Sequence, residues 1–306
     1  MKSSRYSLFL VALFTLIVLA LVTAPGAALS ATPSSSGNPD TLAKMHEINE
    51  ALAASGMNIA IEEIAYFTIG PGRPSDRILQ QPFRWVPNDS RRNAAGNDIT
   101  YLVDQSDGAT ASGLSNADTE AAIDRGFDTW QADSCLRKVA LVKRADSGED
   151  PDIFDSFFGF GSAGDPFLAD IVNAGWLPRA FFEAVTGAPD NVLAFSVTFI
   201  FTDEFGNPTD IDGNNYLDTA LNEVYYNDTF GTPGEPREGF PWGININLPG
   251  IDVETVAVHE NGHSLGVGHF GPPPTAIMNP VYAGILHELA PIDHAGMCTI
   301  WSSWPR

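Results

Sequence analysis

Three of the six histidines of this 306-residue chain fall within one segment, HENGHSLGVGH, which covers residues 259–269. His259 and His263 are four positions apart, so on a helix they share one face and can direct their imidazole nitrogens at one ion about 2.0–2.1 Å away. Glu260 follows the first histidine, which places its carboxylate beside the ion and within reach of a bound water. His269 can reach the same ion if the chain turns back before it. These residues predict a zinc site with three protein ligands and a fourth position for water, as in catalytic sites.

The sequence also indicates the helix and the turn that would position these histidines. Asp252 is a candidate N-cap and Glu254 suits a first helical turn, so we expect a helix near 252–266. Gly266 can adopt the left-handed conformation that ends this helix and turns the chain. The alternative is a surface helix whose histidines are in register by chance. A glycine in mid-helix, Gly262, costs about 1 kcal/mol relative to alanine, which packing alone does not explain, and this favours the zinc site.

The eleven residues resemble the HExxHxxGxxH signature of the metzincins, and the HExGH form resembles the matrixin branch. The resemblance implies a methionine turn beneath the zinc at Met278 in AIMNPVY. It also implies that Pro280 and Tyr282 belong to a wall of the pocket for the substrate residue after the cleaved bond, and that Asp293 braces the methionine turn. ITYLV, AIDRGFDTW and PIDHAGMCTIW are similar to the first strand, first helix and last helix of matrixin catalytic domains.

The resemblance covers about residues 85–306 and implies an α+β fold: a twisted mixed sheet, a packing helix, an active-site helix and a C-terminal helix. The implied activity is hydrolysis of peptide bonds in a protein or peptide substrate that lies extended along an edge strand. Zn²⁺ would activate the water, and Glu260 would act first as general base and then as general acid. A rival hypothesis is a zinc-bound peptide-binding module without turnover, but such a module has no use for Glu260.

Two features of matrixins are missing from this sequence. Matrixins usually hold a second, structural zinc through upstream histidines, whereas no histidine occurs here between His46 and His259. Their propeptides usually carry a cysteine that blocks the catalytic zinc, yet no cysteine precedes Cys135. We therefore expect no second zinc and no thiolate-based latency. We expect no metal role for His287 or His294.

The charge balance limits the class of partner. Lys and Arg total 16 against 38 Asp and Glu, which gives a formal net charge of −22. This balance argues against binding to nucleic acid or to anionic lipid, and it suits divalent cations. The hydrophobic content of 44% is sufficient for a packed core, and we expect a monomer.

The N-terminus has the layout of a secretory signal peptide, predicted to cover residues 1–30. Lys2 and Arg5 precede an apolar run over residues 8–22, and small residues follow it. An uncleaved membrane anchor is the alternative, because the run approaches the length that spans a bilayer. Residues 31–84 are interpreted as an N-terminal extension, either a pro-segment or a packing segment, and residues 85–306 as the catalytic domain. Both alternatives predict an exported, extracellular chain.

An acidic segment, DIDGNNYLD, suggests a calcium site. Asp210, Asp212, Asn214 and Asp218 occupy positions 1, 3, 5 and 9 of an EF-hand-like loop, a spacing that favours oxygen ligation of Ca²⁺. The loop lacks the turn glycine and the bidentate glutamate, so it is not a true EF-hand. An acidic surface turn without an ion is the alternative.

The two cysteines are Cys135 and Cys298. In an exported chain two cysteines most simply pair with each other, so we expect a disulfide between the first helix and the C-terminal helix. Buried free cysteines are the alternative.

Periodicity and turn residues predict the remaining elements. Helices are expected over residues 41–54, 116–135 and 179–185, and the apolar stretch MNIAIEEIAYF is expected to pack as a strand or short helix. Strands are expected at ITYLV, KVALV and VLAFSVTFIF. The rest of residues 145–190, rich in Gly, Asp, Pro and Phe, is expected to be dominated by loops.

Overall fold

The computed structural model describes residues 39–70, 81–92, 96–161 and 164–305. A mixed sheet of seven strands lies at its centre, with the strand order β1-β6-β7-β5-β3-β4 and with β2 paired to β7. The strands are β1 (Ile59–Thr68), β2 (Phe83–Arg84), β3 (Ile99–Val103), β4 (Leu141–Lys143), β5 (Ile171–Leu177), β6 (Val192–Phe201) and β7 (Leu217–Asn227). A small sheet of β8 (Trp242–Gly243) and β9 (Ile251–Asp252) lies apart from it.

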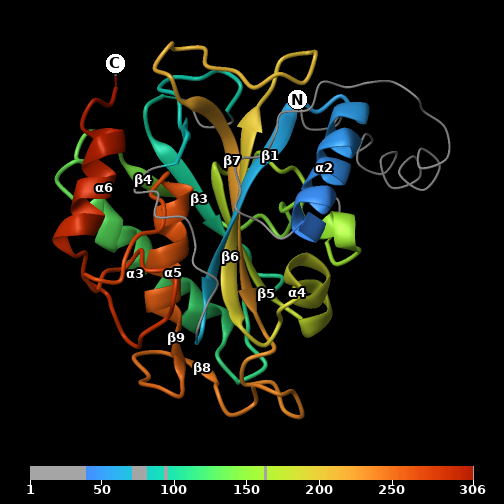
Figure 1. Cartoon of the computed structure of the whole chain (residues 1–306), viewed down its shortest axis with the longest axis vertical. Helices are drawn as coiled ribbons and strands as arrows, with labels where there is room; N and C mark the ends of the chain where they lie inside the picture. The colour runs from blue at the N-terminus through green and yellow to red at the C-terminus, as the bar shows by residue number, and fades with distance from the viewer. Residues whose placement is uncertain (1–38, 71–80, 93–95, 162–163, 306) are drawn as a thin grey trace.

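Helices cover both faces of the large sheet (Figure 1). α2 (Pro39–Ala54) and α4 (Arg179–Thr186) lie on one side, and α3 (Asn116–Gln131), α5 (Val253–Ser264) and α6 (Pro291–Trp301) lie on the other. A short 3₁₀ helix, η2 (Asp155–Phe158), precedes β5. β1 and β7 pair with β6 antiparallel, whereas β3, β4, β5 and β7 pair with one another in parallel. The predicted α+β class with a twisted mixed sheet is confirmed.

The sheet separates two hydrophobic cores, because successive side chains of a strand point to opposite faces. On β7, Val224 and Tyr226 pack in the core that includes α3, α5 and α6. Tyr225, between them, packs in the core that includes α2 and α4. The zinc motif therefore lies on one side of the sheet, with a second, aromatic-rich core behind it.

The structure confirms most of the expected elements and corrects three. Helices form at α2, α4, α5 and α6, and strands at β1, β3 and β6. α3 ends at Gln131 instead of residue 135, because the Asp133 carboxylate accepts the Cys135 N–H at 2.7 Å and holds a turn there. β4 begins at Leu141, three residues later than the start of KVALV. The described part of residues 145–190 is mostly loop outside α4, as expected, but the expectation missed β5, which lies there in the middle of the sheet.

Part of the predicted N-terminal extension is built into the domain. α2 buries Met45, Ile48 and Leu52 in the core that also contains β1. The Asn49 side chain accepts the Ile61 N–H at 2.6 Å and donates to the Ile61 carbonyl at 3.0 Å, which fixes the helix on the strand. The predicted signal peptide lies outside the described residues, and within the described ranges no helix is long and apolar enough to cross a membrane.

Candidate metal centre

The helix α5 carries the first two histidines and is buried along its whole length. Asp252 caps it, because its carboxylate accepts the Thr255 N–H at 2.9 Å, as the sequence predicts. α3 packs closely on α5 at Gly126, where an added Cβ would lie 3.2 Å from the Val258 nitrogen. From α3 the Trp130 indole N–H also donates to the Val258 carbonyl at 2.7 Å. These contacts fix the position of the histidine-bearing turn.

The chain reverses after α5 at Gly266, which has a φ of 87°. Only a residue without Cβ adopts this conformation without strain. The Val267 N–H then donates to the Gly262 carbonyl at 2.9 Å, which closes the end of the helix. This turn brings His269 back to the helix, as the spacing of the motif predicts.

The three imidazoles converge on one point. Their Nε2 atoms are 3.2 Å apart between His259 and His263, and 3.0 Å from each of these to His269. Three nitrogens bound to one tetrahedral zinc at about 2.0–2.1 Å would lie roughly 3.3 Å apart. The spacing of the nitrogens therefore suits a zinc ion at their centre.

The hydrogen bonds of the histidines favour a cation at this point. The Nδ1 atom of His259 donates to the Ile277 carbonyl at 2.7 Å, and that of His263 donates to the Val267 carbonyl at 2.9 Å. Because the ring proton of each histidine lies on Nδ1, the two Nε2 atoms are both acceptors, and they face each other at 3.2 Å with no proton between them. Burial lowers the pKa of all three histidines, that of His263 to about 4, which keeps the rings in the neutral, metal-binding form. The residues present fit Zn²⁺.

Glu260 lies beside the histidines on α5 and is fully buried. Neither carboxylate oxygen has a hydrogen-bond partner among the described protein atoms. Burial raises the pKa of this carboxyl well above its usual value, since the charged form is poorly solvated there. A carboxyl with a raised pKa beside a metal ion can both take and return a proton.

The methionine turn lies directly beneath α5. Met278 is fully buried, and an added Cβ at Gly262 would lie 2.5 Å from its sulfur and 2.7 Å from Cζ2 of Trp130. Close packing against these two side chains therefore explains the glycine in mid-helix, and the sequence argument that packing alone does not explain it was wrong. The Asp293 carboxylate accepts the backbone N–H groups of Ile277 at 3.0 Å and Met278 at 3.1 Å, so it holds the turn from α6.

No pattern in the sequence indicated the residue that covers the centre. Phe67, near the end of β1, stacks on His259 with ring centroids 3.8 Å apart and 9° between the planes. β1 runs antiparallel to β6, from Ile59 opposite Phe201 to Thr68 opposite Val192. Its end then pairs in parallel with the Pro280–Tyr282 segment: the Thr68 N–H donates to the Pro280 carbonyl at 3.2 Å, and the Tyr282 N–H donates to the Thr68 carbonyl at 2.8 Å.

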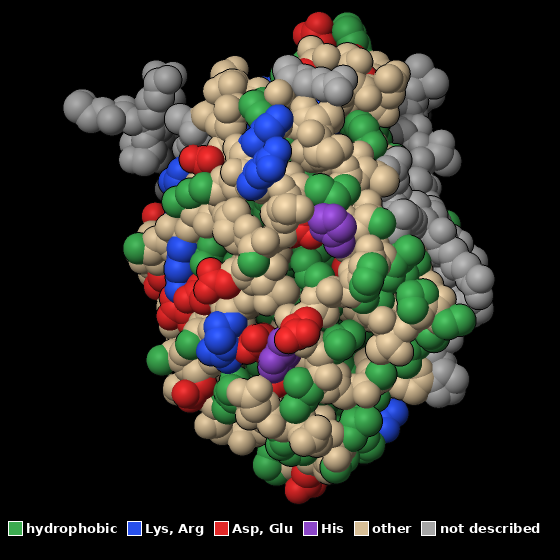
Figure 2. Space-filling model, turned by 90° about the vertical axis from the view of Figure 1, so that its left-hand side faces the viewer, with side chains coloured by type: hydrophobic (Ala, Val, Ile, Leu, Met, Phe, Trp, Pro, Cys, Tyr) green, Lys and Arg blue, Asp and Glu red, His purple; other side chains and the backbone are tan. Residues whose placement is uncertain are grey.

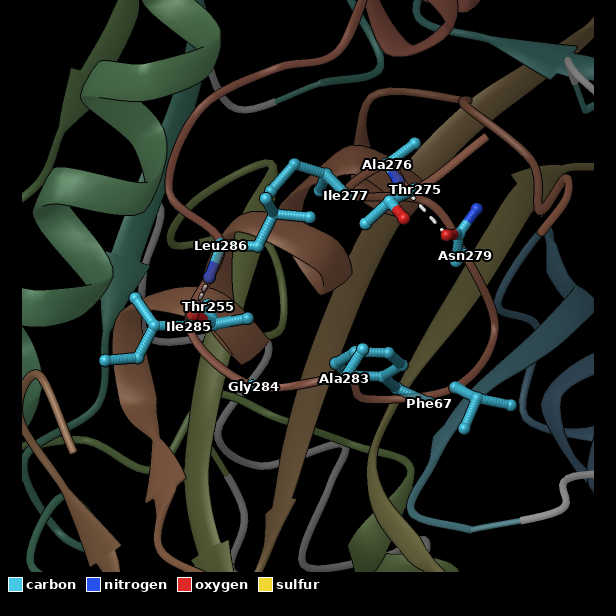
Figure 3. A pocket seen from close by; sticks show the side chains of 11 residues that line it. Phe67, Thr255, Thr275, Ala276, Ile277, Asn279, Ala283, Gly284, Ile285 and Leu286 are labelled. Atoms are coloured by element: carbon cyan, nitrogen blue, oxygen red, sulfur yellow. Dashed lines mark hydrogen bonds between the residues drawn. The ribbon is translucent and has the colours of Figure 1, made fainter. Parts of the chain in front are cut away.

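A pocket lies next to Phe67, lined by Thr255 of α5 and by residues between 275 and 286 (Figure 3). Its wall is held by two hydrogen bonds: the Leu286 N–H donates to Thr255 Oγ1 at 3.0 Å, and the Ala276 N–H donates to Asn279 Oδ1 at 3.1 Å. Tyr282 is anchored beside it, because its hydroxyl oxygen accepts the Asp252 N–H at 2.9 Å. The segment Pro280–Tyr282 thus lies beside β1, and Val281 and Phe67 both line this pocket.

The loop for which calcium is predicted brings the carboxylates of Asp210, Asp212 and Asp218 within 4.8 Å of one another. Asp218 is already engaged, since it bonds to Arg91 at 2.7 Å and to Thr209 Oγ1 at 2.6 Å. Asp210 accepts the backbone N–H groups of residues 214 and 215, and the Asn214 side-chain oxygen accepts the Tyr216 N–H. These bonds also stabilise a turn without an ion, so calcium at this loop stays a prediction.

A disulfide joins Cys135, after α3, to Cys298 of α6, with the Cα atoms 5.1 Å apart. His287 and His294 lie away from the three converging histidines. His287 contacts Asp252 at 2.6 Å, and His294 contacts Asp133 at 2.7 Å. Figure 2 shows acidic side chains interspersed with fewer Lys and Arg side chains on the face that includes α3 and α6.

Comparison with known proteins agrees with this geometry. A family model described as matrixin matches residues 92–302. No curated protein matches the sequence significantly. The chain therefore belongs to the matrixin family of metallopeptidases, whose members are zinc-dependent endopeptidases. The matched region begins after β1, so the strand that covers the metal centre lies outside it.

Proposed function

We propose that this protein is a secreted zinc endopeptidase. The observation that carries the proposal is the convergence of three Nε2 atoms within 3.0–3.2 Å of one another beside the buried carboxylate of Glu260. When bound, Zn²⁺ lowers the pKa of its water to near 7 and polarises the scissile carbonyl. Glu260 accepts the proton of the attacking water and returns it to the leaving amine. Secretion is inferred from the signal-peptide layout of residues 1–30.

The catalytic assignment is tested with Glu260→Ala and His263→Ala. Glu260→Ala should keep the zinc and lose hydrolysis by a factor of about 10² to 10⁴, the usual contribution of general acid–base catalysis. His263→Ala should lose the metal itself, measured as zinc per purified chain. Activity of Glu260→Ala within about tenfold of wild type would remove the proton-transfer role of this residue. Turnover by the wild-type protein also separates an endopeptidase from a zinc-bound peptide-binding module.

The alternative to a secreted enzyme is a protease that stays tethered to the membrane by an uncleaved N-terminal anchor. It differs from a secreted enzyme only in the fate of residues 1–30. N-terminal sequencing of the mature protein decides between them, because a start near residue 31 requires cleavage.

We further propose that substrate occupies the place that β1 holds. An extended peptide can bind an enzyme by adding a strand to a sheet edge. β1 is the last strand at one end of the strand order and pairs only with β6. Without β1, β6 would therefore be the edge strand of the sheet. β1 runs along this edge, passes over the zinc ligand His259 at Phe67, and continues beside Pro280–Tyr282. A substrate in this position would lie with its peptide bonds across the metal centre.

The position of Phe67 indicates the preferred substrate side chain. Its ring lies on an imidazole ligand and lines the pocket formed by residues between 275 and 286. We infer that the pocket accepts a bulky apolar residue directly after the cleaved bond. A peptide library that varies this position should show phenylalanine or leucine enriched over charged residues, and a preference for charged residues would refute the assignment.

This arrangement makes the folded chain latent. His259 and His263 are fully buried, so substrate reaches the metal only after β1 leaves or shifts. Deletion of residues 32–68 should therefore raise the specificity constant above that of the full secreted chain, whereas deletion of residues 32–38 alone should not. The peptide NIAIEEIAYFTIG, residues 58–70, should inhibit the shortened protein competitively.

The second measurement keeps the proposal testable if the deletion unfolds the protein. In that case the same peptide should inhibit the full chain after limited proteolysis before residue 81. Unchanged activity of a folded, zinc-loaded deletion variant, or failure of the peptide to compete, would show that β1 is only structural. The zinc content and the activity of Glu260→Ala test the catalytic assignment independently of the role of β1, so failure of one proposal can be told from failure of the other.

A further inference from the structure

The disulfide between the end of α3 and α6 lies beside an imidazole and a carboxylate. Cys135 follows α3, Cys298 lies on α6, and both are only partly buried. His294 precedes Cys298 by four residues on α6, so their side chains lie on the same face of the helix. One side-chain atom from each of Asp133, Cys135, His294 and Cys298 lies within 4.8 Å of the others.

Asp133 fixes the position of the imidazole and of the first cysteine. Its Oδ2 atom lies 2.7 Å from His294 Nδ1, and its Oδ1 atom accepts the Cys135 N–H at 2.7 Å. A carboxylate on Nδ1 sets the tautomer and the orientation of a histidine ring. The other ring nitrogen of His294, Nε2, is the one nearer to Cys298 Sγ, at 3.3 Å, whereas Nδ1 lies 3.8 Å from this sulfur.

The arrangement suits the chemistry of thiol–disulfide exchange. In this reaction a thiolate attacks one sulfur of a disulfide, and the other sulfur leaves as a thiolate. A thiolate beside a protonated imidazole is stabilised and therefore leaves faster. The Asp133 side chain is only 3% exposed, and a buried carboxylate favours a charged partner, here protonated His294. Because this imidazole contacts Cys298, Cys298 is the sulfur favoured to leave, and Cys135 is the sulfur favoured for attack.

The site is open to a small molecule. The His294 side chain is 47% exposed, so solvent reaches the imidazole beside the disulfide. Arg137 and Lys138 are exposed and follow Cys135 by two and three residues. Their positive charge favours the approach of an anionic thiol to this part of an otherwise acidic protein.

We propose that the Cys135–Cys298 disulfide is a site of thiol exchange in the folded protein, opened by a small anionic thiol of the glutathione class with the assistance of His294. The thiolate of the first molecule bonds to Cys135 Sγ as the bond between the two cysteines breaks, and Cys298 leaves as a thiolate beside the imidazole. A second thiolate attacks the sulfur of the bound molecule, and Cys135 leaves in turn. Two thiols are oxidised to one disulfide, the protein disulfide is reduced to two thiols, and solvent carries the two protons between them.

Opening the disulfide would release α6 from the end of α3. The residue before His294 on α6 is Asp293, whose carboxylate accepts the backbone N–H groups of Ile277 and Met278. The helix that braces the methionine turn is therefore the one that the disulfide fastens to α3. Exchange at this site would change how firmly that helix is held.

The test measures the rate at which glutathione opens the disulfide in the native, zinc-loaded full secreted chain, with the released thiols trapped by alkylation. His294→Gln keeps a polar side chain but removes the charge, and it should slow opening by about tenfold, because a less stabilised thiolate leaves more slowly. His46→Gln, the same change at a half-exposed histidine of α2, is the matched control and should react as wild type does. Loss of folding would expose the disulfide and speed its reduction, so slower opening cannot come from misfolding of the variant.

The position of the mixed disulfide provides a second measurement that needs no variant. Wild-type protein treated briefly with glutathione and then alkylated should carry glutathione on Cys135 and the alkyl group on Cys298, as read by mass spectrometry of its peptides. Equal rates for His294→Gln and His46→Gln, glutathione mainly on Cys298, or no opening before the protein unfolds would overturn the proposal. No readout depends on the activity of the protein, so the result is independent of the catalytic assignment.

Discussion

Gly262→Ala tests the packing of the zinc helix on the methionine turn. In a solvent-exposed helix this change would stabilise the protein by about 1 kcal/mol, because alanine is the better helix former. Here the new Cβ would lie 2.5 Å from the Met278 sulfur and 2.7 Å from Cζ2 of Trp130. Favourable contacts between carbon atoms lie at about 3.5–4.0 Å, so both neighbours would have to move by roughly 1 Å.

Neither neighbour can move freely. Met278 and Trp130 are both fully buried, and Trp130 is held by its 2.7 Å hydrogen bond to the Val258 carbonyl. Overpacking of a core costs about 1–3 kcal/mol, and two close contacts place this case at the upper end. After subtraction of about 1 kcal/mol for helix propensity, we expect a net loss of about 2 kcal/mol. For a domain of this size that lowers Tm by roughly 4–8 °C.

The assay is thermal melting of both proteins at saturating zinc, since a bound ion raises Tm by mass action. A Met278→Ala background provides the internal control, because it removes one of the two obstructions. The penalty for Gly262→Ala should shrink there by at least about 0.5 kcal/mol, the coupling expected of residues in contact. A Tm equal to or above wild type for the single variant would refute the packing argument.

Four further predictions concern the rest of the chain. The denatured, unreduced protein should show no free thiol, and replacing Cys135 and Cys298 together should cost on the order of 4 kcal/mol in chemical unfolding, because the bridge spans 163 residues. Arg92→Leu should cost about 3–5 kcal/mol in the same assay, since it leaves Asp170 charged in a site where that carboxylate is 2% exposed. Burial raises the pKa of Asp228 from 3.8 to about 6, so between these pH values the native state holds a proton that the unfolded state releases. The contribution of this residue to stability should therefore fall as the pH rises from about 4 to 6. The Tm of Asp228→Asn should lack this part of the pH dependence. Thiol-reactive mercurials should not activate the full secreted chain, because no cysteine precedes Cys135, and a large mercurial-dependent rise in activity would contradict this.

The fold was predictable where local patterns are strong. β6 was expected because every residue of VLAFSVTFIF except Ser196 is apolar or β-branched, and the capped helix α5 was also expected from the sequence. β5 and β7 were not expected, because they carry Asn173, Asn222 and Glu223 at buried positions. Polar residues in a strand interior weaken the hydrophobic pattern. Their tertiary partners make them tolerable: Asn222 bonds to Ser196 and Thr198, and Glu223 holds a loop.

The sequence by itself determined the chemistry of the zinc motif. The spacing of His259, Glu260 and His263 follows from the helical repeat, and Gly266 is needed at the turn because its φ is 87°. Both are local properties, so they can be read without knowledge of the fold.

Only the tertiary structure decided what surrounds that motif. Phe67 reaches His259 across nearly two hundred residues because β1 pairs with the free edge of β6, and edge pairing is not encoded in either strand alone. Asp104, Asp150 and Asp152 meet because a parallel strand and a long loop bring together residues distant in sequence. Side-chain periodicity reports which face of an element is buried, whereas the partner on that face depends on how the whole chain packs.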